Sequence, residues 1–257
     1  GDWVMQQVGR KHEKPFFLAS GFYRPHLPWH VPRAYFEHYP LDSIQLPEVP
    51  VNDLEDIPPA GIAMANPEGD HKKVIEYGQW RNAVQGYLSS IEFADAQVGR
   101  VVAALDQSPH KHNTIVVLWT DHGWQLGHKN RWEKFSLWDI ATNTPLIIKH
   151  PQKDIASKKV NQPVSLLDLY PTMMDFIGLQ KPSDLQGVSL LPFIEDKNYK
   201  REEPAIITYE EGNQSVRKDG FNYIRYKNGT EELYNHTNDR MEYTNIIDDE
   251  SYAEKKT

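Results

Sequence analysis

The chain has 257 residues, of which 39% are hydrophobic and 25% charged, and it contains no cysteine. This length and composition are typical of a globular protein with one large domain and room for a small appendage, without disulfides or thiol chemistry. The net charge of −8 and the lack of a basic stripe exclude nucleic acid as a default partner, and no apolar run is long enough to span a membrane.

The N-terminal part of the chain combines one short predicted strand with irregular segments. Residues 16–19 (FFLA) are an apolar run that predicts a strand, and Pro25, Pro28 and Pro32 follow it. Proline removes backbone donors and blocks helix, so this region should be extended or turned. Residues 39–69 are rich in Pro, Asp and Asn with no period, which predicts a long surface loop.

A helix, two strands and a second helix should follow. Apolar residues recur at three- and four-residue steps from about Lys72 to Asp106, which predicts one amphipathic helix. The runs at 114–120 (TIVVLWT) and 145–150 (PLIIKH) are typical of strands buried on both faces, and hence of a parallel sheet. Residues 164–179 are helical in pattern.

The ends of that last helix also carry signals. Ser165 is a suitable N-cap, Gly178 a suitable stop, and Pro171 is expected to begin a second helical segment.

Beyond about Lys200 the pattern changes to short strand-like runs. They are separated by the turn dipeptides Asp219-Gly220 and Asn228-Gly229, which predict a small antiparallel sheet. The predicted fold is therefore α/β, with a mostly parallel central sheet and a C-terminal β subdomain. We expect residues 1–198 to form the α/β portion and residues 199–257 the antiparallel subdomain.

Polar residues crowd the end of the 114–120 strand. In open α/β sheets, ligands bind beyond the carboxyl ends of the strands, where Asp121 and His122 fall. Gly123 would give the backbone freedom for both side chains to converge on one ion. A hard oxygen and an imidazole nitrogen could form half of a divalent metal site. The alternative is an Asp-His-Gly turn in which the aspartate only caps backbone amides.

The residues that follow favour the first interpretation. His128, Lys129, Arg131 and Lys134 place positive charge close to that carboxylate, which suits a tetrahedral anion such as sulfate or phosphate. Three tryptophans interleave with them and are either core residues or platforms for sugar rings: Trp124, Trp132 and Trp138.

A second basic cluster follows the predicted 16–19 strand. It consists of Arg24, His26, Trp29, His30 and Arg33. If that strand is parallel to 114–120, both clusters lie at the same edge of the sheet. Histidine changes charge near neutral pH, so His26 is a suitable proton donor to a leaving oxygen.

Several long blocks of the sequence resemble type I sulfatases, and most closely iduronate-2-sulfatase and its bacterial relatives. They are KPFFLASGFYRPHLPW, YLSSIEFADAQVGRVVAALD, TIVVLWTDHGWQLGHKNRWEKFSLWDIATNTPLII, VSLLDLYPTMMDFIGL and SVRKDGFNYIRYKNGTEELYNHTND. The resemblance spans nearly the whole chain. It implies an alkaline-phosphatase-like α/β fold, here partial, and hydrolysis of sulfate esters.

The resemblance also assigns roles to individual residues. Asp121 and His122 match a metal pair of the family, for which calcium is the expected ion. Lys134 matches the lysine that contacts sulfate and the leaving oxygen, and His26 the histidine that holds sulfate and protonates the departing alcohol. His128 replaces a glutamate that is common in this segment of the family, which weakens any transfer of substrate contacts.

Other parts of the family's machinery are not in this sequence. The family draws two more aspartates and a formylglycine nucleophile from an early segment with a C-x-P-x-R or S-x-P-x-R motif, which this chain lacks. We expect them on a preceding segment or another chain, so the 257 residues alone should be inactive. The resemblance also implies export to the periplasm, the extracellular space or the lysosome.

The expected function of the whole enzyme is removal of sulfate from a sulfated carbohydrate, such as a glycosaminoglycan or other polysaccharide fragment. The candidate substrate contacts are Arg24, Trp29, His30, His128 and Arg131. Two alternatives stay open: a catalytically inactive remnant that binds sulfated glycans, and a phosphatase or phosphodiesterase of the same superfamily.

Overall fold

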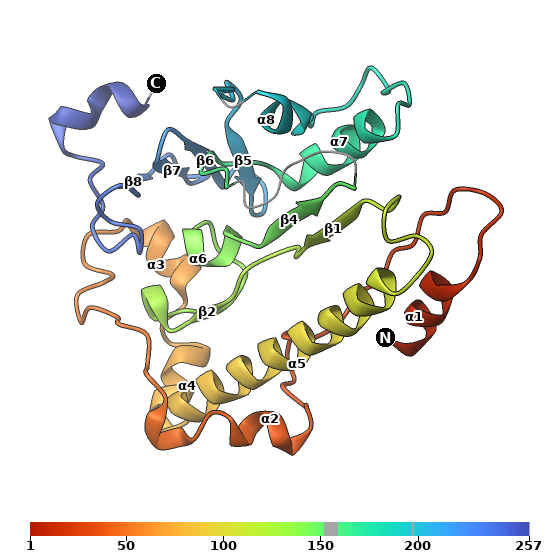
Figure 1. The fold of residues 1–257 in the computed structure, drawn as a ribbon. Coiled ribbons are helices and arrows are strands. Elements are labelled where there is room, and N and C mark those ends of the chain that lie inside the picture. The colour runs from red at the N-terminus through yellow and green to blue at the C-terminus, as the bar shows by residue number, and fades with distance from the viewer. Residues whose placement is uncertain (152–158, 197, 257) are drawn as a thin grey trace. The chain divides into compact units, whose positions relative to one another are not determined.

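The computed structural model describes residues 1–151, 159–196 and 198–256, which fall into two compact units. The first unit comprises residues 1–47, 72–117 and 148–154, and the second comprises residues 48–71, 118–147 and 155–257. Figure 1 labels their helices and strands. The units cut across the predicted division between residues 198 and 199, and that division stays a prediction.

The first unit is organised around one long helix, α5 (Trp80–Asp106). Two shorter helices, α1 (Asp2–Gly9) and α2 (Arg33–Glu37), pack on α5, and the one-turn helix η1 (Leu41–Ser43) also contacts it (Figure 1). Val4 and Val8 of α1 are one turn apart and therefore share a face, which is buried against Leu105 of α5.

The helical pattern at 72–106 predicts the position of the helix but not its interruption. The structure has two helices, α4 (Asp70–Glu76) and α5, separated by Gly78 with φ +60°. That left-handed conformation ends an α-helix, and glycine adopts it without a Cβ penalty. The apolar spacing alone cannot reveal the break, since the period resumes directly after it.

The predicted strands near the candidate site are shorter and more exposed than expected. β1 (Val116–Trp119) and β4 (Leu146–Lys149) form a two-stranded sheet. Trp119 is 47% exposed and Ile147 59%, so the prediction that both strands are buried on both faces is wrong. An unbroken apolar run does not by itself report burial.

The predicted strand at residues 16–19 does not form either. None of the described strands pairs with it, and Phe17 is 91% exposed. A strand needs a neighbour to take up its backbone hydrogen bonds, and an apolar run without that neighbour stays irregular.

The second unit contains the predicted antiparallel sheet. Its strands lie in sequence order as β5 (Ala205–Thr208), β6 (Gln214–Lys218), β7 (Phe221–Arg225) and β8 (Glu231–Asn235). Asp219 and Gly220 both have positive φ and form the tight β6–β7 turn, as the dipeptide predicts. Ile224, Tyr226 and Tyr234 of this region join Leu137 and Trp138 in one buried core.

The remaining elements of the second unit are short. They are α3 (Pro59–Ala65), β2 (Gln125–Leu126), η2 (His128–Asn130), β3 (Trp132–Glu133), α6 (Asp139–Thr142), η3 (Leu166–Asp168), α7 (Leu169–Phe176), α8 (Leu191–Glu195) and η4 (Glu250–Lys256). Ser165 caps η3 and forms a capping box with Asp168, as predicted for the cap. The next helix begins at Leu169 and not at Pro171.

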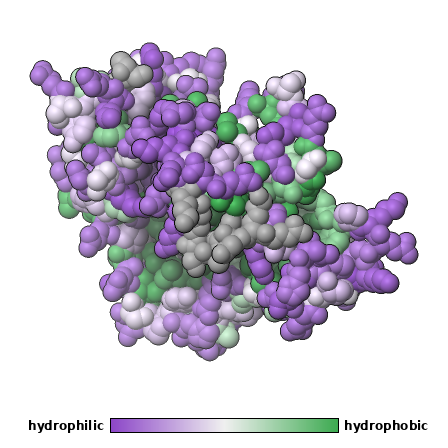
Figure 2. All heavy atoms as spheres, turned by 45° about the horizontal axis from the view of Figure 1, so that its top comes forward, coloured by the Kyte–Doolittle hydropathy of each residue, from purple (hydrophilic) through white to green (hydrophobic). Residues whose placement is uncertain are grey.

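The Pro-rich segment 39–69 is not wholly a surface loop. It contains α3, and Asp53, Ile57 and Ala65 within it are buried. On the face shown in Figure 2, hydrophilic side chains predominate and hydrophobic residues gather between them. Of the helices in the described part of the chain, none combines the length and apolarity needed to cross a bilayer.

Candidate active site

His122 is oriented by a hydrogen bond to the backbone directly after β1. Its Nδ1 lies 2.8 Å from the carbonyl oxygen of Gly123. A carbonyl only accepts, so Nδ1 carries the proton and the lone pair of a neutral ring is on Nε2. A backbone carbonyl on one ring nitrogen is the usual support for a histidine that binds a metal through the other nitrogen.

Two further charged groups lie beside that Nε2 atom. The Oδ2 atom of Asp121 is 3.6 Å from it, and the Nζ atom of Lys134 is 3.0 Å from it. The Asp121 side chain is 75% exposed and the His122 side chain 23%, so the group opens to the surface. A carboxylate, an imidazole and an ammonium therefore meet at one point.

A small hairpin delivers Lys134 to that point. β2 and β3 pair with Gln125 opposite Glu133 and Leu126 opposite Trp132, and Lys134 follows directly. Gln125 is completely buried and receives a 2.6 Å hydrogen bond from Ser136. These contacts hold the backbone on both sides of Lys134.

Asp121 and His122 fit a divalent metal as part of its ligand set. A carboxylate oxygen and an imidazole lone pair are suitable donor atoms, and the two side chains converge. The described residues contain no group of three or more His, Cys, Asp or Glu side chains arranged to hold a metal ion. The pair would therefore contribute to a site that needs further ligands.

The second predicted cluster lies in the first unit and is organised by its own backbone. The Nδ1 atom of His26 is 2.9 Å from the carbonyl of Leu27, the indole of Trp29 donates to Pro25, and Trp29 packs against Gly86. A Cβ on that glycine would lie 2.9 Å from the indole ring. The loop is thus held against α5.

Two other members of that cluster bond to each other. The Nε and Nη2 atoms of Arg24 donate to the carbonyl of His30 at 3.2 and 3.0 Å. Arg33 makes an exposed ion pair with Glu37, one turn along α2. Arg24, His26 and His30 belong to the first unit, and Asp121, His122 and Lys134 to the second. Convergence of these two groups on one pocket stays a prediction.

The predicted basic cluster after Gly127 is only partly available to an anion. Lys129 is 2% exposed and its Nζ atom lies 2.8 Å from Oδ1 of Asp53, whose Oδ2 accepts from the Lys129 amide. This buried ion pair neutralises the ammonium. Lys129 therefore anchors the 128–131 turn to the Pro-rich segment, and counting it with the substrate-facing cations is wrong.

Arg131 also forms hydrogen bonds within the protein. Its Nη1 atom donates to the carbonyls of Met64 and Ala65 at the C-terminal end of α3. Those carbonyls have no partner within the helix, so a guanidinium stabilises them well. A direct sugar contact by Arg131 stays a prediction.

His128 is largely buried, and burial lowers its pKa to about 4. Among the described residues its Nδ1 atom has no hydrogen-bond partner. At neutral pH His128 is therefore an uncharged ring, so any role at the substrate would be through hydrogen bonding and not through charge. The three neighbouring tryptophans, Trp124, Trp132 and Trp138, are buried, as expected of core residues.

Sequence patterns do not reveal the residues that support the site. Asp53, Arg217, Glu232 and Glu242 are buried and bond to the segments around Lys134. Their neighbours in the sequence are typical of loops or strands and give no sign of a special role. These residues stand out only once their burial is known, because charged side chains are rarely buried in a core.

The chain belongs to the sulfatase family. The family model described as Sulfatase matches residues 2–179, and the one described as N-sulphoglucosamine sulphohydrolase, C-terminal, matches residues 127–257. A sulfatase of Formosa agariphila is 38% identical over 99% of this chain and 50% of its own length. Human iduronate 2-sulfatase is 32% identical over 65% of this chain and 37% of its own length.

The fold is likewise that of solved sulfatases. The structure of BT4656 in complex with its substrate D-glucosamine-2-N,6-O-disulfate covers 99% of this chain, at a TM-score of 0.77 and 20% identity, over 66% of the solved chain. The likeness shows the alkaline-phosphatase-like α/β fold. The chain spans about half the length, or less, of the two curated relatives above.

Proposed function

We propose that the enzyme containing this chain hydrolyses sulfate esters on a carbohydrate, such as a glycosaminoglycan or another polysaccharide fragment. The observation that carries the proposal is the meeting of Asp121, His122 Nε2 and Lys134 Nζ at the end of β1. Membership of the sulfatase family supports a sulfuric ester as the substrate.

Each residue has a role that its geometry supports. The Lys134 ammonium would bind a sulfate oxygen and stabilise negative charge on the leaving oxygen. Asp121 and His122 would hold a divalent metal, expected to be calcium, which when bound supplies positive charge that polarises the sulfate group. Both roles place the reacting sulfate beside the exposed carboxylate of Asp121.

His26 would protonate the leaving alcohol. Because its Nδ1 atom faces the Leu27 carbonyl, the Nε2 atom carries a proton only when the ring is charged. Donation from Nε2 then leaves a neutral ring that still bonds to Leu27. The remaining candidate substrate contacts are Arg24, Trp29, His30, His128 and Arg131. We retain them as sugar contacts, with His128 acting as an uncharged hydrogen-bonding group.

The rest of the machinery would come from a segment outside this chain. That segment would supply the formylglycine nucleophile and further metal ligands and would complete a mostly parallel central sheet; without it the 257 residues would be inactive. We also propose that the enzyme is exported.

The carbohydrate substrate is supported by two relatives. One is named iduronate 2-sulfatase, and the solved BT4656 holds a disulfated glucosamine. The human relative is 32% identical over 65% of this chain, which favours a substrate of the same class without fixing the sugar or the sulfate position.

The test is hydrolysis of matched esters by the purified enzyme that contains this chain. We expect it to hydrolyse 4-nitrophenyl sulfate and a 2-O-sulfated uronic-acid disaccharide, and to lose both activities when a chelator removes the metal. Turnover of 4-nitrophenyl phosphate alone would favour the phosphatase alternative and reject the proposal. Binding of sulfated disaccharides without turnover would favour the inactive remnant.

A further inference from the structure

Three consecutive residues that lead from Lys134 into the first turn of α6 are held by charged and polar side chains from the C-terminal sheet and the loop after it. The three are Leu137, Trp138 and Asp139, and all are buried. The side chains that bind them are Arg217, Asn222, Glu232 and Glu242, which we call the clamp. All the residues concerned belong to the second unit.

The first two contacts of the clamp come from β7 and β8. The Nδ2 atom of Asn222 donates to the Leu137 carbonyl at 3.3 Å, and the indole of Trp138 donates to Oε2 of Glu232 at 2.9 Å. Glu232 is completely buried and also accepts hydrogen bonds from the hydroxyls of Tyr226 and Tyr234. The backbone and side chain before α6 are thus fixed.

Asp139, the first residue of α6, takes two further contacts. Its amide donates to Oε2 of Glu242 at 2.7 Å, and its carboxylate accepts from Arg217. A carboxylate at the first turn of a helix satisfies amides that have no partner within the helix. Glu242 thereby sets where α6 begins.

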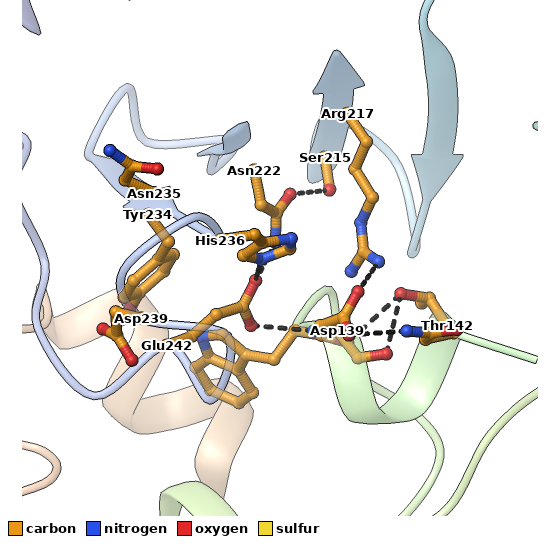
Figure 3. A network of polar contacts seen from close by, with 12 residues as sticks. Asp139, Thr142, Ser215, Arg217, Asn222, Tyr234, Asn235, His236, Asp239 and Glu242 are labelled. Atoms are coloured by element: carbon orange, nitrogen blue, oxygen red, sulfur yellow. Dashed lines mark hydrogen bonds and ion pairs between the residues drawn. The ribbon is translucent and has the colours of Figure 1, made fainter. Parts of the chain in front are cut away.

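Glu242 is the centre of this network. Figure 3 shows it between Asp139 on one side and Asn222 and His236 on the other, and its Oε1 atom lies 2.6 Å from Asn222 Nδ2 and 2.8 Å from His236 Nε2. The residue is 1% exposed and its backbone has φ +60°. A non-glycine residue persists in that strained conformation only where its surroundings over-determine it.

Helix α6 in turn packs on the backbone that carries His122. The Gly123 amide donates to the Ala141 carbonyl at 2.7 Å. A Cβ at residue 123 would overlap the Ile140 carbonyl oxygen, so the two backbones are in direct contact. The Gly123 carbonyl is the group that orients the His122 ring.

We propose that Glu242 is a positioning residue for the active site. By fixing the start of α6 it holds the Gly123 backbone, and through it the direction of His122 Nε2. By fixing residues 137–139 the clamp also limits the movement of Lys134, whose carbonyl accepts from the Ser136 amide. The expected effect of Glu242 on catalysis rests on the proposed function. The expected effect on the Gly123 backbone does not depend on it.

The structural consequence is tested by hydrogen exchange of the Gly123 amide in Glu242→Gln. Glutamine keeps the size of the side chain but loses the charge and one acceptor oxygen. We expect exchange at Gly123 to become about 10-fold faster or more, since its partner helix loses its anchor. Glu242→Asp keeps the charge on a shorter side chain and serves as the second variant should the first fail to fold.

Two controls separate positioning from loss of stability. Phe193→Leu alters a buried residue of α8 in the same unit and should lower Tm without changing the relative protection of Gly123. Glu211→Ala removes an exposed acid of the same unit that pairs with Lys227 at the surface, and should change neither quantity. Equal loss of Gly123 protection in Glu242→Gln and Phe193→Leu would overturn the proposal.

The catalytic consequence is tested by the kinetics of the same variants. In an active enzyme we expect Glu242→Gln to lower kcat about 10- to 100-fold with a smaller change in KM, as for a displaced catalytic group. An unchanged kcat alongside a deprotected Gly123 would contradict the positioning role. If wild type hydrolyses no sulfate ester, the proposed function fails, and the exchange experiment still decides whether Glu242 anchors α6.

Discussion

At the scale of single residues, the orientation of two side chains decides what the site can do. The Gly123 carbonyl binds Nδ1 of His122 and so fixes the tautomer of the ring. The Lys134 ammonium lies at the other ring nitrogen, Nε2. Lys134 can therefore exchange its contact with His122 for one with an anion while a cation binds the imidazole.

Replacement of Lys134 tests this arrangement in the complete enzyme. We expect Lys134→Ala to lower kcat/KM for a sulfate ester by about 100- to 1,000-fold, the range for removal of one donor from a site of developing charge. Tm should stay within error, because the side chain is only partly buried. Lys227→Ala, at an exposed ion pair, is the control for loss of a lysine, and its rate should match wild type. An unchanged rate in Lys134→Ala would remove Lys134 from the site.

His128 should make stability depend on pH. Burial lowers its pKa from 6.5 to about 4, so its contribution to the free energy of unfolding is fully present above pH 6.5 and is lost as the pH falls toward 4. The loss of unfolding free energy amounts to about 3 kcal/mol, since each unit of difference in pKa corresponds to about 1.36 kcal/mol.

Urea unfolding measured between pH 7 and pH 4 checks this prediction. His128→Gln should retain more of its free energy of unfolding at pH 4 relative to pH 7 than wild type does. His112→Gln, at an exposed position, should follow wild type. Parallel curves for wild type and His128→Gln would contradict a buried neutral ring.

Residue types and spacing predict part of this site. The adjacency of Asp121 and His122 at a strand end, with Lys134 a few residues on, leads to the three side chains that the structure brings together. Nothing in the sequence shows that Lys129 points inward, because its partner Asp53 lies 76 residues away. Long-range pairing of buried charges depends on the fold and leaves no local pattern.

At the scale of elements, the site depends on the contact between the β1 exit and α6. The sequence predicts a conformational role for Gly123, but the structure gives a steric one: the Ile140 carbonyl leaves no room for a Cβ. The steric role cannot be predicted from the local sequence, because the close approach of α6 to Gly123 depends on two separate segments of the chain.

Replacement of glycine by alanine should have opposite effects on stability at Gly123, which contacts α6, and at Gly99, which has open space around it. Gly123→Ala should destabilise the protein by about 1–3 kcal/mol, as overpacking does, and should disturb His122. Gly99→Ala, in the middle of α5 with open space around it, should stabilise by about 0.5–1 kcal/mol. Chemical denaturation measures both; a neutral Gly123→Ala would show that α6 moves aside at little cost.

The predicted elements succeed where local signals suffice. The β6–β7 turn and the Ser165 cap depend on a few adjacent residues, and both form as expected. The strand at 16–19 and the burial of β1 depend on neighbours that the local sequence does not specify, and both predictions are wrong.

At the scale of the whole molecule, we predict that residues from two distant parts of the chain serve one pocket in the complete enzyme. His26 belongs to the first unit, and Asp121, His122 and Lys134 to the second. The shared pocket is the central prediction, because it would bring the proposed sulfate-binding residue Lys134 and the proposed proton donor His26 to one substrate.

The most direct test is a distance measurement between the two groups in the complete enzyme. The chain has no cysteine, so Gly21→Cys beside the His26 loop and Phe135→Cys beside Lys134, both exposed, accept a spin label each without competition. We predict a single narrow distance at the short end of the range accessible to pulsed electron paramagnetic resonance. A long or broad distribution in an enzyme that still hydrolyses sulfate esters would contradict the shared pocket.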